Sequence, residues 1–387
     1  MRRVLTILTA IALLLVSLGI GVFTADLPFW RRALQLPLAG DAIYLPVATL
    51  GATDDVDTGA APRMLPVKQS AAAFDPLTIE ESANRARAMG SRALLVMHDG
   101  QLVMERYFLD DDARTLLPAT VIARPLAAMA VGLALAEGRI RSIDVPVSTW
   151  LTEWEGETRG RITLRQLLEE TSGLETGGDI TRLLRRSPLA DKSSLLRFAT
   201  ARGVRMLLGN DFESSALGFR LDHEPGGFHN VSPSNTQLVA VILERATGVP
   251  YEQFIDQRLW RAAGAGHAEL PLDRRAGMPA AHCCWRATAR DMLRVASLLA
   301  DGRAGDRQVL PPQWLTEMTR PSRVSAATGL QLNLLRLEGE DGFEVADGDG
   351  SAVWIIPSRR IAILHVGAHA AAELRELPAL LLRGQAR

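Results

Sequence analysis

Lysine is nearly missing from this chain of 387 residues, in which Lys68 and Lys192 are the only two. Tyrosine is almost as rare, with Tyr44, Tyr107 and Tyr251. Arginine therefore carries nearly all of the positive charge, and a guanidinium stays protonated at any ordinary pH. Enzyme chemistry that needs a lysine as base, or a tyrosine to help move protons, has very few side chains to draw on here.

Cysteine is limited to one adjacent pair, Cys283 and Cys284. A disulfide between neighbouring residues is strained, and two cysteines are too few for a disulfide framework or a metal cage. We therefore expect two small buried thiols, no metal site and no cofactor. The formal net charge of −1 gives no electrostatic reason to expect a nucleic acid as partner.

The N-terminus carries a long apolar run. Arg2 and Arg3 precede residues 4–23, an uncharged stretch that would measure about 30 Å as a helix and could span a bilayer. We predict that residues 1–25 form an uncleaved membrane anchor, with a cleaved signal peptide as the alternative. The two arginines favour a single pass through the cell membrane, with the globular part on the outer, periplasmic side.

The two ends of the remaining chain predict strands. Residues 26–75 carry repeated Pro, Gly and Asp, which predicts a linker lying partly against the domain that follows. An Asp-Gly turn between the apolar runs 93–97 and 102–107 predicts a hairpin. Two further strands, 351–356 and 361–366, close the chain. Strands at both ends with helices between them predict one sheet in an α/β (α+β) fold with a helical insertion.

Several helix starts are visible between these strands. A polar helix is expected near 78–89, and the apolar spacing after Leu126 predicts another that ends at Gly138. Capping-box patterns predict three more helix starts. Their residue pairs are Thr163 and Gln166, Ser234 and Gln237, and Thr288 and Asp291.

Several segments resemble, in the right order, those of a known family. These segments are residues 92–108, 115–174, 287–294, 308–318 and 351–357, and the most specific match is the part from 162 to 174. They resemble the serine hydrolases of the class C β-lactamase and penicillin-binding-protein superfamily, especially its esterase and amide-hydrolase branches. The resemblance implies a β-lactamase/transpeptidase-like three-layer sandwich over residues 76–387. Its antiparallel sheet would be built from both chain ends, with a helical subdomain at about 145–285.

The positions that carry the family's chemistry are occupied by other residues. In the family, Ser-x-x-Lys opens the helix after the first hairpin, with the serine as nucleophile and the lysine as its base partner. Aligned without a gap, these positions are Val121 and Arg124. An isopropyl group cannot attack a carbonyl, and an arginine cannot take a proton as a desolvated lysine can. Pro125 also lacks the N–H that would bond to the carbonyl of Val121, so the start of this helix is expected to be altered.

The family's second and third motifs are changed as well. The tyrosine of the second motif corresponds to Val231, and Tyr251 is expected to be a packing residue instead. The third motif falls within residues 345–351, where alternating Asp and Gly favour a turn over a calcium loop. We hypothesise that Arg124 pairs with an aspartate of this turn, closing the pocket. The candidate pocket residues are Thr120, Arg124, Ser232, Asp347, Gly348 and Asp349.

Three functional hypotheses follow from the resemblance and these departures. The favoured one is a membrane-anchored homologue that has lost hydrolysis and acts by scaffolding, or by binding a small molecule or peptide in the old pocket. The alternative is an active hydrolase of esters or small amides with a nucleophile outside the family pattern. Candidates for it are Ser172, Ser232, Ser234 and a Cys283 thiolate beside His282. A purely structural envelope protein, with a filled pocket, is the third.

Overall fold

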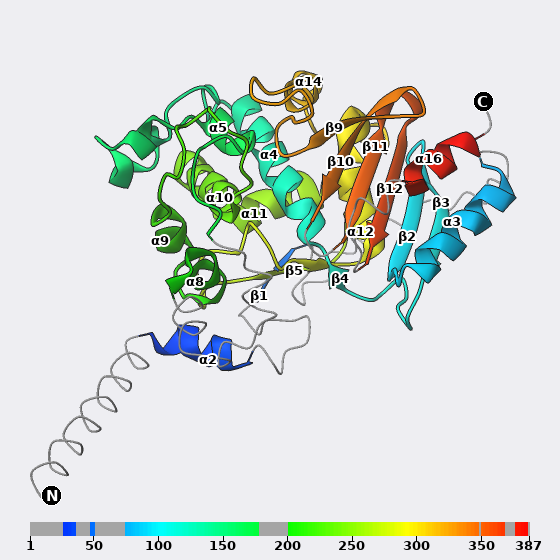
Figure 1. Cartoon of the computed structure of the whole chain (residues 1–387), viewed down its shortest axis with the longest axis horizontal. Helices are drawn as coiled ribbons and strands as arrows, with labels where there is room; N and C mark the ends of the chain where they lie inside the picture. Colours follow the sequence, from blue (N-terminus) through cyan, green and yellow to red (C-terminus); the bar gives the residue numbers. More distant parts are fainter. Residues whose placement is uncertain are drawn as a thin grey trace, which may run out of the picture.

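The computed structural model describes residues 26–35, 47–50, 74–177, 200–347, 350–367 and 376–385. Its main feature is a six-stranded antiparallel sheet in the order β3-β2-β12-β11-β10-β9 (Figure 1). The strands are β2 (Ala93–His98), β3 (Gln101–Tyr107), β9 (Asn333–Leu337), β10 (Glu340–Ala346), β11 (Ala352–Ile356) and β12 (Ile361–Val366). Because β2 pairs with β12, the sheet joins the two ends of the domain, as predicted.

Alternation along the strands gives the sheet two buried faces. Leu94 and Val96 point toward one face, where α3 (Pro76–Ala88) and α16 (Glu376–Arg383) form the outer layer (Figure 1). Leu95 and Met97 point the other way, into the larger core that includes the helical part of the chain. Helices therefore cover both sides of the sheet, and the molecule has the three layers expected from the resemblance.

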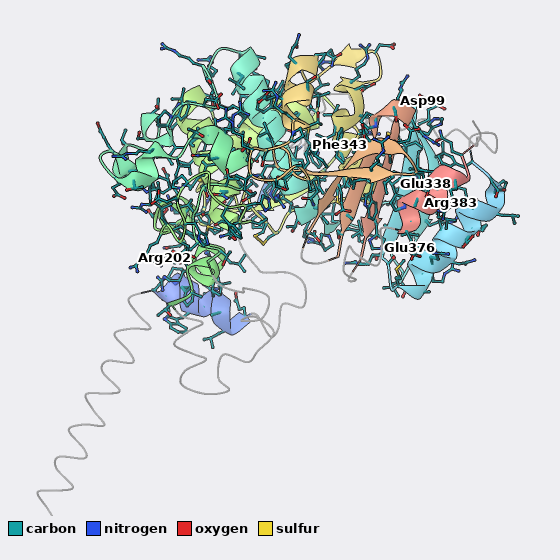
Figure 2. All side chains as sticks on the ribbon, turned by 45° about the horizontal axis from the view of Figure 1, so that its top comes forward. Asp99, Arg202, Glu338, Phe343, Glu376 and Arg383 are labelled. Atoms are coloured by element: carbon teal, nitrogen blue, oxygen red, sulfur yellow. A yellow bond between two sulfur atoms is a disulfide. The ribbon has the colours of Figure 1, made fainter. Side chains whose placement is uncertain are left out.

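An ion pair also connects the outer helical layer to the edge of the sheet. Arg383 of α16 forms an ion pair of 2.9 Å with Glu338, which lies in the turn between β9 and β10 (Figure 2). At the other hairpin, Asp99 and Gly100 have φ angles of 50° and 73°. Such positive angles are what a two-residue Asp-Gly turn requires, so this sequence signal was specific.

A second, smaller sheet lies at the border of the helical part. It has the order β1-β5-β6-β4, with β1 (Val47–Leu50), β4 (Leu117–Pro118), β5 (Ala268–Pro271) and β6 (Arg286–Ala287). Strand β1 and helix α2 (Leu27–Gln35) come from the stretch predicted as a linker. Phe29 and Ala33 of α2 pack against α8 (Arg202–Leu208), so these two described pieces are part of the folded structure.

The helical part surrounds α4 (Thr120–Ala136) and α10 (Pro233–Thr247), which contact each other. Around them lie α5 (Leu164–Leu168), α9 (Phe212–Leu217), α11 (Tyr251–Ile255) and α14 (Pro312–Met318). Helices α12 (Ala289–Ala296) and α13 (Leu298–Asp301) instead pack against the six-stranded sheet. A short hairpin, β7 (Arg303–Ala304) and β8 (Arg307–Gln308), separates α13 from α14. A π-helical turn, Asp256–Trp260, continues α11, and 3₁₀ turns span Val147–Thr149, Thr152–Trp154, Thr158–Arg161 and Pro357–Arg359. Gly132 lets Trp314 of α14 lie against α4, since a Cβ there would stand 2.0 Å from the indole.

Two of the three predicted helix caps are confirmed. Thr163 and Gln166 form a complete capping box at α5, and the Thr288 side chain accepts from the backbone N–H of Asp291 at α12. The third was wrong: α10 begins at Pro233 and its N-cap is Ser232. Proline's fixed φ angle suits the first helical position, which moves the start of the helix ahead of Ser234.

The predicted membrane anchor lies outside the described residues. Within the described ranges, no helix combines the length and the apolar character needed to cross a membrane.

Candidate functional site

Val121, which the resemblance aligns with the family nucleophile, lies at the start of α4. Strand β4 leads into this helix, and Val121 is only 1% exposed. The helix runs without interruption from Thr120 past Pro125 to Ala136, so the proline is accommodated within the first turns. Pro125 is the sixth helical residue, beyond the first four N–H groups that have no helical partner, so the carbonyl of Val121 lacks its usual helical donor while the helix continues. Thr120 uses its Oγ1 to accept a hydrogen bond of 3.1 Å from the backbone N–H of Cys284.

Arg124, one turn further along α4, is held by two partners. Its Nε donates a hydrogen bond of 2.8 Å to Oε1 of Gln331 and lies 3.6 Å from Oε1 of Glu170. The Glu170 side chain is only 2% exposed, against 24% for the arginine. A carboxylate with so little water around it needs a cation or donors nearby. The pair therefore fixes a positive charge at the position that the resemblance aligns with the lysine of the family.

Glu170 also joins α4 to the start of α10. Its Oε2 accepts a hydrogen bond of 3.1 Å from the backbone N–H of Ser232 and another from the side-chain amide of Asn235. Ser172 in turn donates to Oδ1 of Asn235 over 2.7 Å. Glu170 itself has a φ angle of 56°, an uncommon conformation for a residue other than glycine. The result is a buried polar network between α4 and α10, organised around one carboxylate.

Sequence reasoning missed this role of Glu170. The residue lies inside the segment with the most specific resemblance, 162–174, and a largely buried arginine at position 124 implies an acid somewhere nearby. What the sequence does not indicate is which acid, because the two residues are brought together by the packing of separate helices. Gln331 carries no sequence signal of its own.

The hypothesised ion pair between Arg124 and the 345–351 turn differs from the observed one. In the part of the chain that the structure describes, the carboxylate within ion-pair distance of Arg124 is that of Glu170. Asp347 instead accepts a hydrogen bond of 2.9 Å from the backbone N–H of Ser351, which closes a turn. Gly348 and Asp349 lie outside the described residues.

The position of the family tyrosine is on the surface. Val231 is 47% exposed and Phe228, three residues before it, is 54% exposed. Ser232 is buried, and its Oγ donates to the backbone carbonyl of Glu175 over 2.7 Å. Tyr251 lies fully inside the core, as expected of a packing residue.

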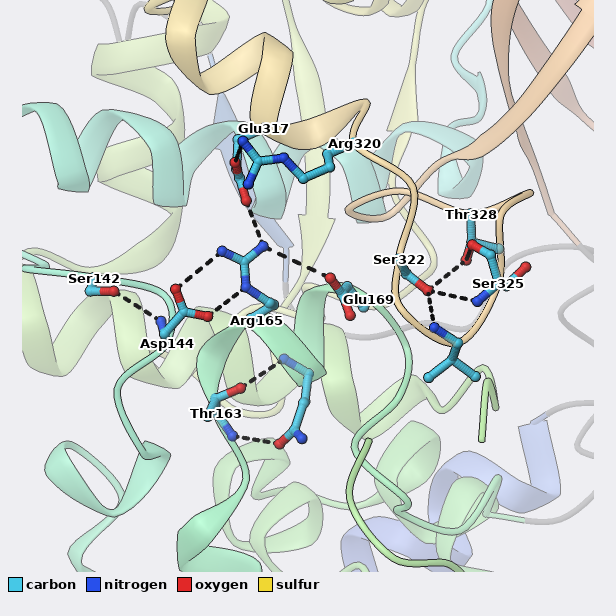
Figure 3. Close-up of polar contacts among 12 residues, drawn as sticks. Ser142, Asp144, Thr163, Arg165, Glu169, Glu317, Arg320, Ser322, Ser325 and Thr328 are labelled. Atoms are coloured by element: carbon cyan, nitrogen blue, oxygen red, sulfur yellow. Dashed lines mark hydrogen bonds and ion pairs between the residues drawn. The ribbon is translucent and has the colours of Figure 1, made fainter. Parts of the chain in front are cut away.

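A second charged network surrounds Arg165 (Figure 3). Arg165 of α5 contacts the carboxylates of Asp144, Glu169 and Glu317, the last of which belongs to α14. The loop after α14 then returns to α5, where the backbone N–H of Gln331 donates to the carbonyl of Leu168 over 2.8 Å. The partner of Arg124 is therefore positioned from α5 and α14 together. Burial raises the pKa of Glu169, and the neighbouring Arg165 opposes that shift.

The expectation of two buried free thiols was wrong. Cys283 and Cys284 are joined in a disulfide, and both residues are partly exposed. Adjacent residues can form this bond when the backbone between them adopts an unusual shape, and Cys284 has a φ angle of 69°. A disulfide sulfur is not a thiolate, so the Cys283 nucleophile is removed from the alternatives in this state. Burial also lowers the pKa of His282 to about 4, which leaves its imidazole neutral at pH 7.

The candidate hydroxyl groups of Ser172, Ser232 and Ser234 are engaged in structural hydrogen bonds. The Oγ atoms of Ser232 and Ser234 lie 2.9 Å apart, and Ser232 also bonds to a backbone carbonyl rather than to a basic side chain. A serine–histidine contact exists elsewhere: Oγ of Ser91 lies 2.6 Å from Nε2 of His365. Both residues are at most 1% exposed, which places them inside the fold, where a substrate has no access.

An open groove of about 510 Å³ lies between the 157–159 turn and the stretch after α9. Its lining includes Arg159, Arg202, Arg220 and Leu221, and none of the predicted site residues. Across the described ranges, no group of three or more His, Cys, Asp or Glu side chains could hold a metal ion.

Known proteins with similar sequences or structures share this fold. The sequence profile of the Beta-lactamase family matches residues 78–370. The 6-aminohexanoate-dimer hydrolase of Paenarthrobacter ureafaciens is 25% identical over 317 residues, which is 76% of this chain and 75% of that protein. Among solved structures, a penicillin-binding protein from Bacillus halodurans has a TM-score of 0.59 at 13% identity, covering 78% of this chain and 99% of the other. A D-stereospecific amidohydrolase from a Streptomyces species has a TM-score of 0.56 at 19% identity, covering 78% and 98%.

The antiparallel sheet, the two helical layers and these neighbours define a protein of the β-lactamase and penicillin-binding-protein fold. Since the profile covers most of the domain, the chain belongs to the Beta-lactamase family.

Proposed function

We propose that this protein is a non-hydrolytic member of its family, which binds a small molecule or peptide, or serves as a scaffold, at the outer face of the membrane. The observation that carries the proposal is the state of Arg124. Its guanidinium occupies the position of the family's base and is held there by Glu170 and Gln331. A guanidinium that stays charged and engaged cannot accept a proton from a nucleophile.

The neighbouring positions support the same proposal. Val121 offers no lone pair, and Val231 presents an exposed isopropyl group in place of a phenol. The hydroxyl and sulfur groups that could replace the nucleophile are bonded to backbone, to amide side chains or to each other. None of these arrangements supplies the nucleophile and adjacent base that acyl transfer requires.

The test is covalent labelling of the full-length protein with a fluorophosphonate and with a fluorescent penicillin. We expect no stoichiometric label at any residue, because both probes require an activated nucleophile. An active family member labelled in parallel shows that the probes are competent. A single labelled residue, mapped by mass spectrometry, would overturn the proposal.

A second candidate function is hydrolysis of a small amide or ester, favoured by the relatives that are named as hydrolases. It predicts turnover of a substrate such as the 6-aminohexanoate dimer, from the name of one relative. Incubation of this chain with that dimer, followed by chromatography of the products, separates the two functions. The membrane location is tested independently, by alkaline extraction of membranes and by mass measurement of the mature N-terminus.

A further inference from the structure

The disulfide between Cys283 and Cys284 lies at a junction of the fold. On one side, the backbone N–H of Cys284 donates to Oγ1 of Thr120, the first residue of α4. Next to it, the N–H of Ala119 donates to the carbonyl of Trp285 over 2.8 Å. The cysteine loop is thus hydrogen-bonded to the two residues that precede Val121.

On its other side, the same disulfide packs against the outer helices. Both cysteines contact the apolar cluster formed by α2 and α8, which includes Phe29 and Leu208. Cys283 also contacts the cluster that contains Phe212 of α9. The two sulfur atoms therefore lie between helix α2 and the start of α4.

The backbone conformation of Cys284 in the disulfide-bonded loop differs from the one that we expect once the disulfide is reduced. Cys284 has a φ angle of 69°, in the left-handed region that side chains other than glycine rarely adopt. The S–S bond closes a small ring that includes the 283–284 peptide and so restricts that torsion. When the ring opens, this restraint disappears and the extended conformations become accessible. Such a move would turn the N–H of Cys284 away from Thr120.

We propose that Cys283–Cys284 is a site of thiol–disulfide exchange with an external dithiol, and that its reduction loosens the start of α4. A thiolate of the dithiol attacks one cysteine sulfur, the S–S bond breaks, and a mixed disulfide forms with the other cysteine leaving as a thiolate. The second thiol of the reductant then displaces the first cysteine. The reductant becomes a disulfide, and the protein gains two electrons and two protons as two thiols.

Two features favour exchange in the folded protein. Neither cysteine is fully buried, so an attacking thiolate can approach without global unfolding. Exposed disulfides are also the ones that are reduced most readily. The inference does not depend on whether the protein hydrolyses any substrate, since its test measures thiol alkylation and hydrogen exchange and not activity.

The experiment compares the full-length protein, in detergent micelles, before and after treatment with dithiothreitol. Alkylation and peptide mapping should find no free thiol before treatment and two modified cysteines after it, with the far-ultraviolet circular dichroism unchanged. Hydrogen exchange at the amides of Ala119 and Cys284 should then be faster by roughly tenfold. A non-glycine residue is less stable in the left-handed region than in the extended one, and this difference shifts the equilibrium toward the open conformation by about that factor.

Two double variants separate the effect of the bond from that of the backbone. In Cys283→Ser/Cys284→Ser the exchange should be fast with or without dithiothreitol. In Cys283→Ser/Cys284→Gly it should stay slow, because glycine keeps a positive φ angle at no steric cost. Should either variant fail to fold, the wild-type comparison alone decides. Free thiols in the untreated protein, alkylation only after denaturation, or unchanged exchange at Ala119 after reduction would each overturn the proposal.

Discussion

Arg124 and Glu170 form a partly buried ion pair in which Nε and Oε1 are 3.6 Å apart. The arginine comes from α4 and the glutamate from the turn after α5, so the pair connects two separate elements of the helical part. Glu170 is also the acceptor for the start of α10 through Ser232 and Asn235. Removing either charge should therefore affect the stability of the domain as well as the properties of the pocket.

We predict that Glu170→Ala lowers the free energy of unfolding by about 3 kcal/mol, because it leaves a guanidinium and two donors without their acceptor. Arg124→Ala should cost a similar amount, since it leaves a buried carboxylate without its cation. The double variant should cost about 1–3 kcal/mol less than the sum of the two. Urea unfolding of the four proteins measures this coupling.

The matched control for this cycle is the exposed pair of Arg85 and Glu376. Arg85→Ala should change the free energy of unfolding by no more than about 1 kcal/mol, since both groups are well solvated. Costs that are strictly additive for Arg124 and Glu170 would contradict the structural role assigned to their contact.

Glu170 also determines how the family's reactive groups would behave if they were restored. In Val121→Ser/Arg124→Lys the new lysine would lie beside a buried carboxylate, which favours its charged form and so prevents it from acting as a base. We predict that Val121→Ser/Arg124→Lys/Glu170→Gln reacts with a fluorophosphonate at least about tenfold faster than the double variant, as expected if the neutral fraction of the lysine rises tenfold. Time courses of labelling at position 121 measure the two rates, and equal rates would count against an electrostatic block by Glu170.

The sequence predicted those parts of the fold in which a turn motif and long apolar strands indicated the same structure. The Asp99-Gly100 turn and the apolar strands around it predict one hairpin, and Ile361–Val366 supplies the strand that pairs with it. Strands β4 and β6 were not predicted, because two residues each are too few to show a period of alternation. The Ser234 cap was wrong because the proline before it sets the start of the helix.

The sequence indicated the positions of the candidate site but not the contacts between its side chains. The resemblance aligned positions 121, 124 and 231 with the family's motifs, but the partner of Arg124 depends on how α4 packs against the turn after α5. The disulfide was rejected on the general rule that adjacent cysteines make a strained bond, whereas the left-handed backbone at Cys284 accommodates it. Contacts between residues distant in sequence, and unusual torsion angles, leave little trace in composition or periodicity.

Arg165 provides a prediction for the network that supports Gln331. Arg165→Met should destabilise the protein by about 2 kcal/mol at pH 8, because Glu169 would lose its ion-pair partner and Glu317 would keep only the exposed Arg320. Burial already raises the pKa of Glu169, and loss of the opposing cation raises it further in the folded state. The folded variant then binds more protons than its unfolded chain, so the deficit should shrink as the pH is lowered toward 5.

Thermal unfolding of wild type and variant at a series of pH values checks this dependence. Arg320→Met is the matched control, since Arg320 contacts the same Glu317 but is 62% exposed. It should cost less than about 1 kcal/mol at either pH. A deficit for Arg165→Met that is the same at pH 5 and pH 8 would contradict the electrostatic explanation.

Glu244, near the end of α10, should make stability depend on pH near neutrality. Burial raises the pKa of this carboxyl to about 7, against the weaker effect of the Tyr251 backbone N–H, which donates to it. Because the pKa is higher in the folded state, the folded protein binds the extra proton between about pH 4.5 and 7. This contribution to stability is present at pH 5, is lost as the pH rises through 7, and does not return above it.

Glu244→Gln keeps an acceptor for Tyr251 and removes the titration. We predict that the variant is more stable than wild type at pH 8, by on the order of 1 kcal/mol after allowance for partial exposure, and close to wild type at pH 5. Glu155→Gln, at an exposed position in the helical part of the fold, should show no such difference. Urea titrations at the two pH values decide the matter: parallel stability curves for wild type and Glu244→Gln would mean that the carboxyl stays ionised in the folded protein.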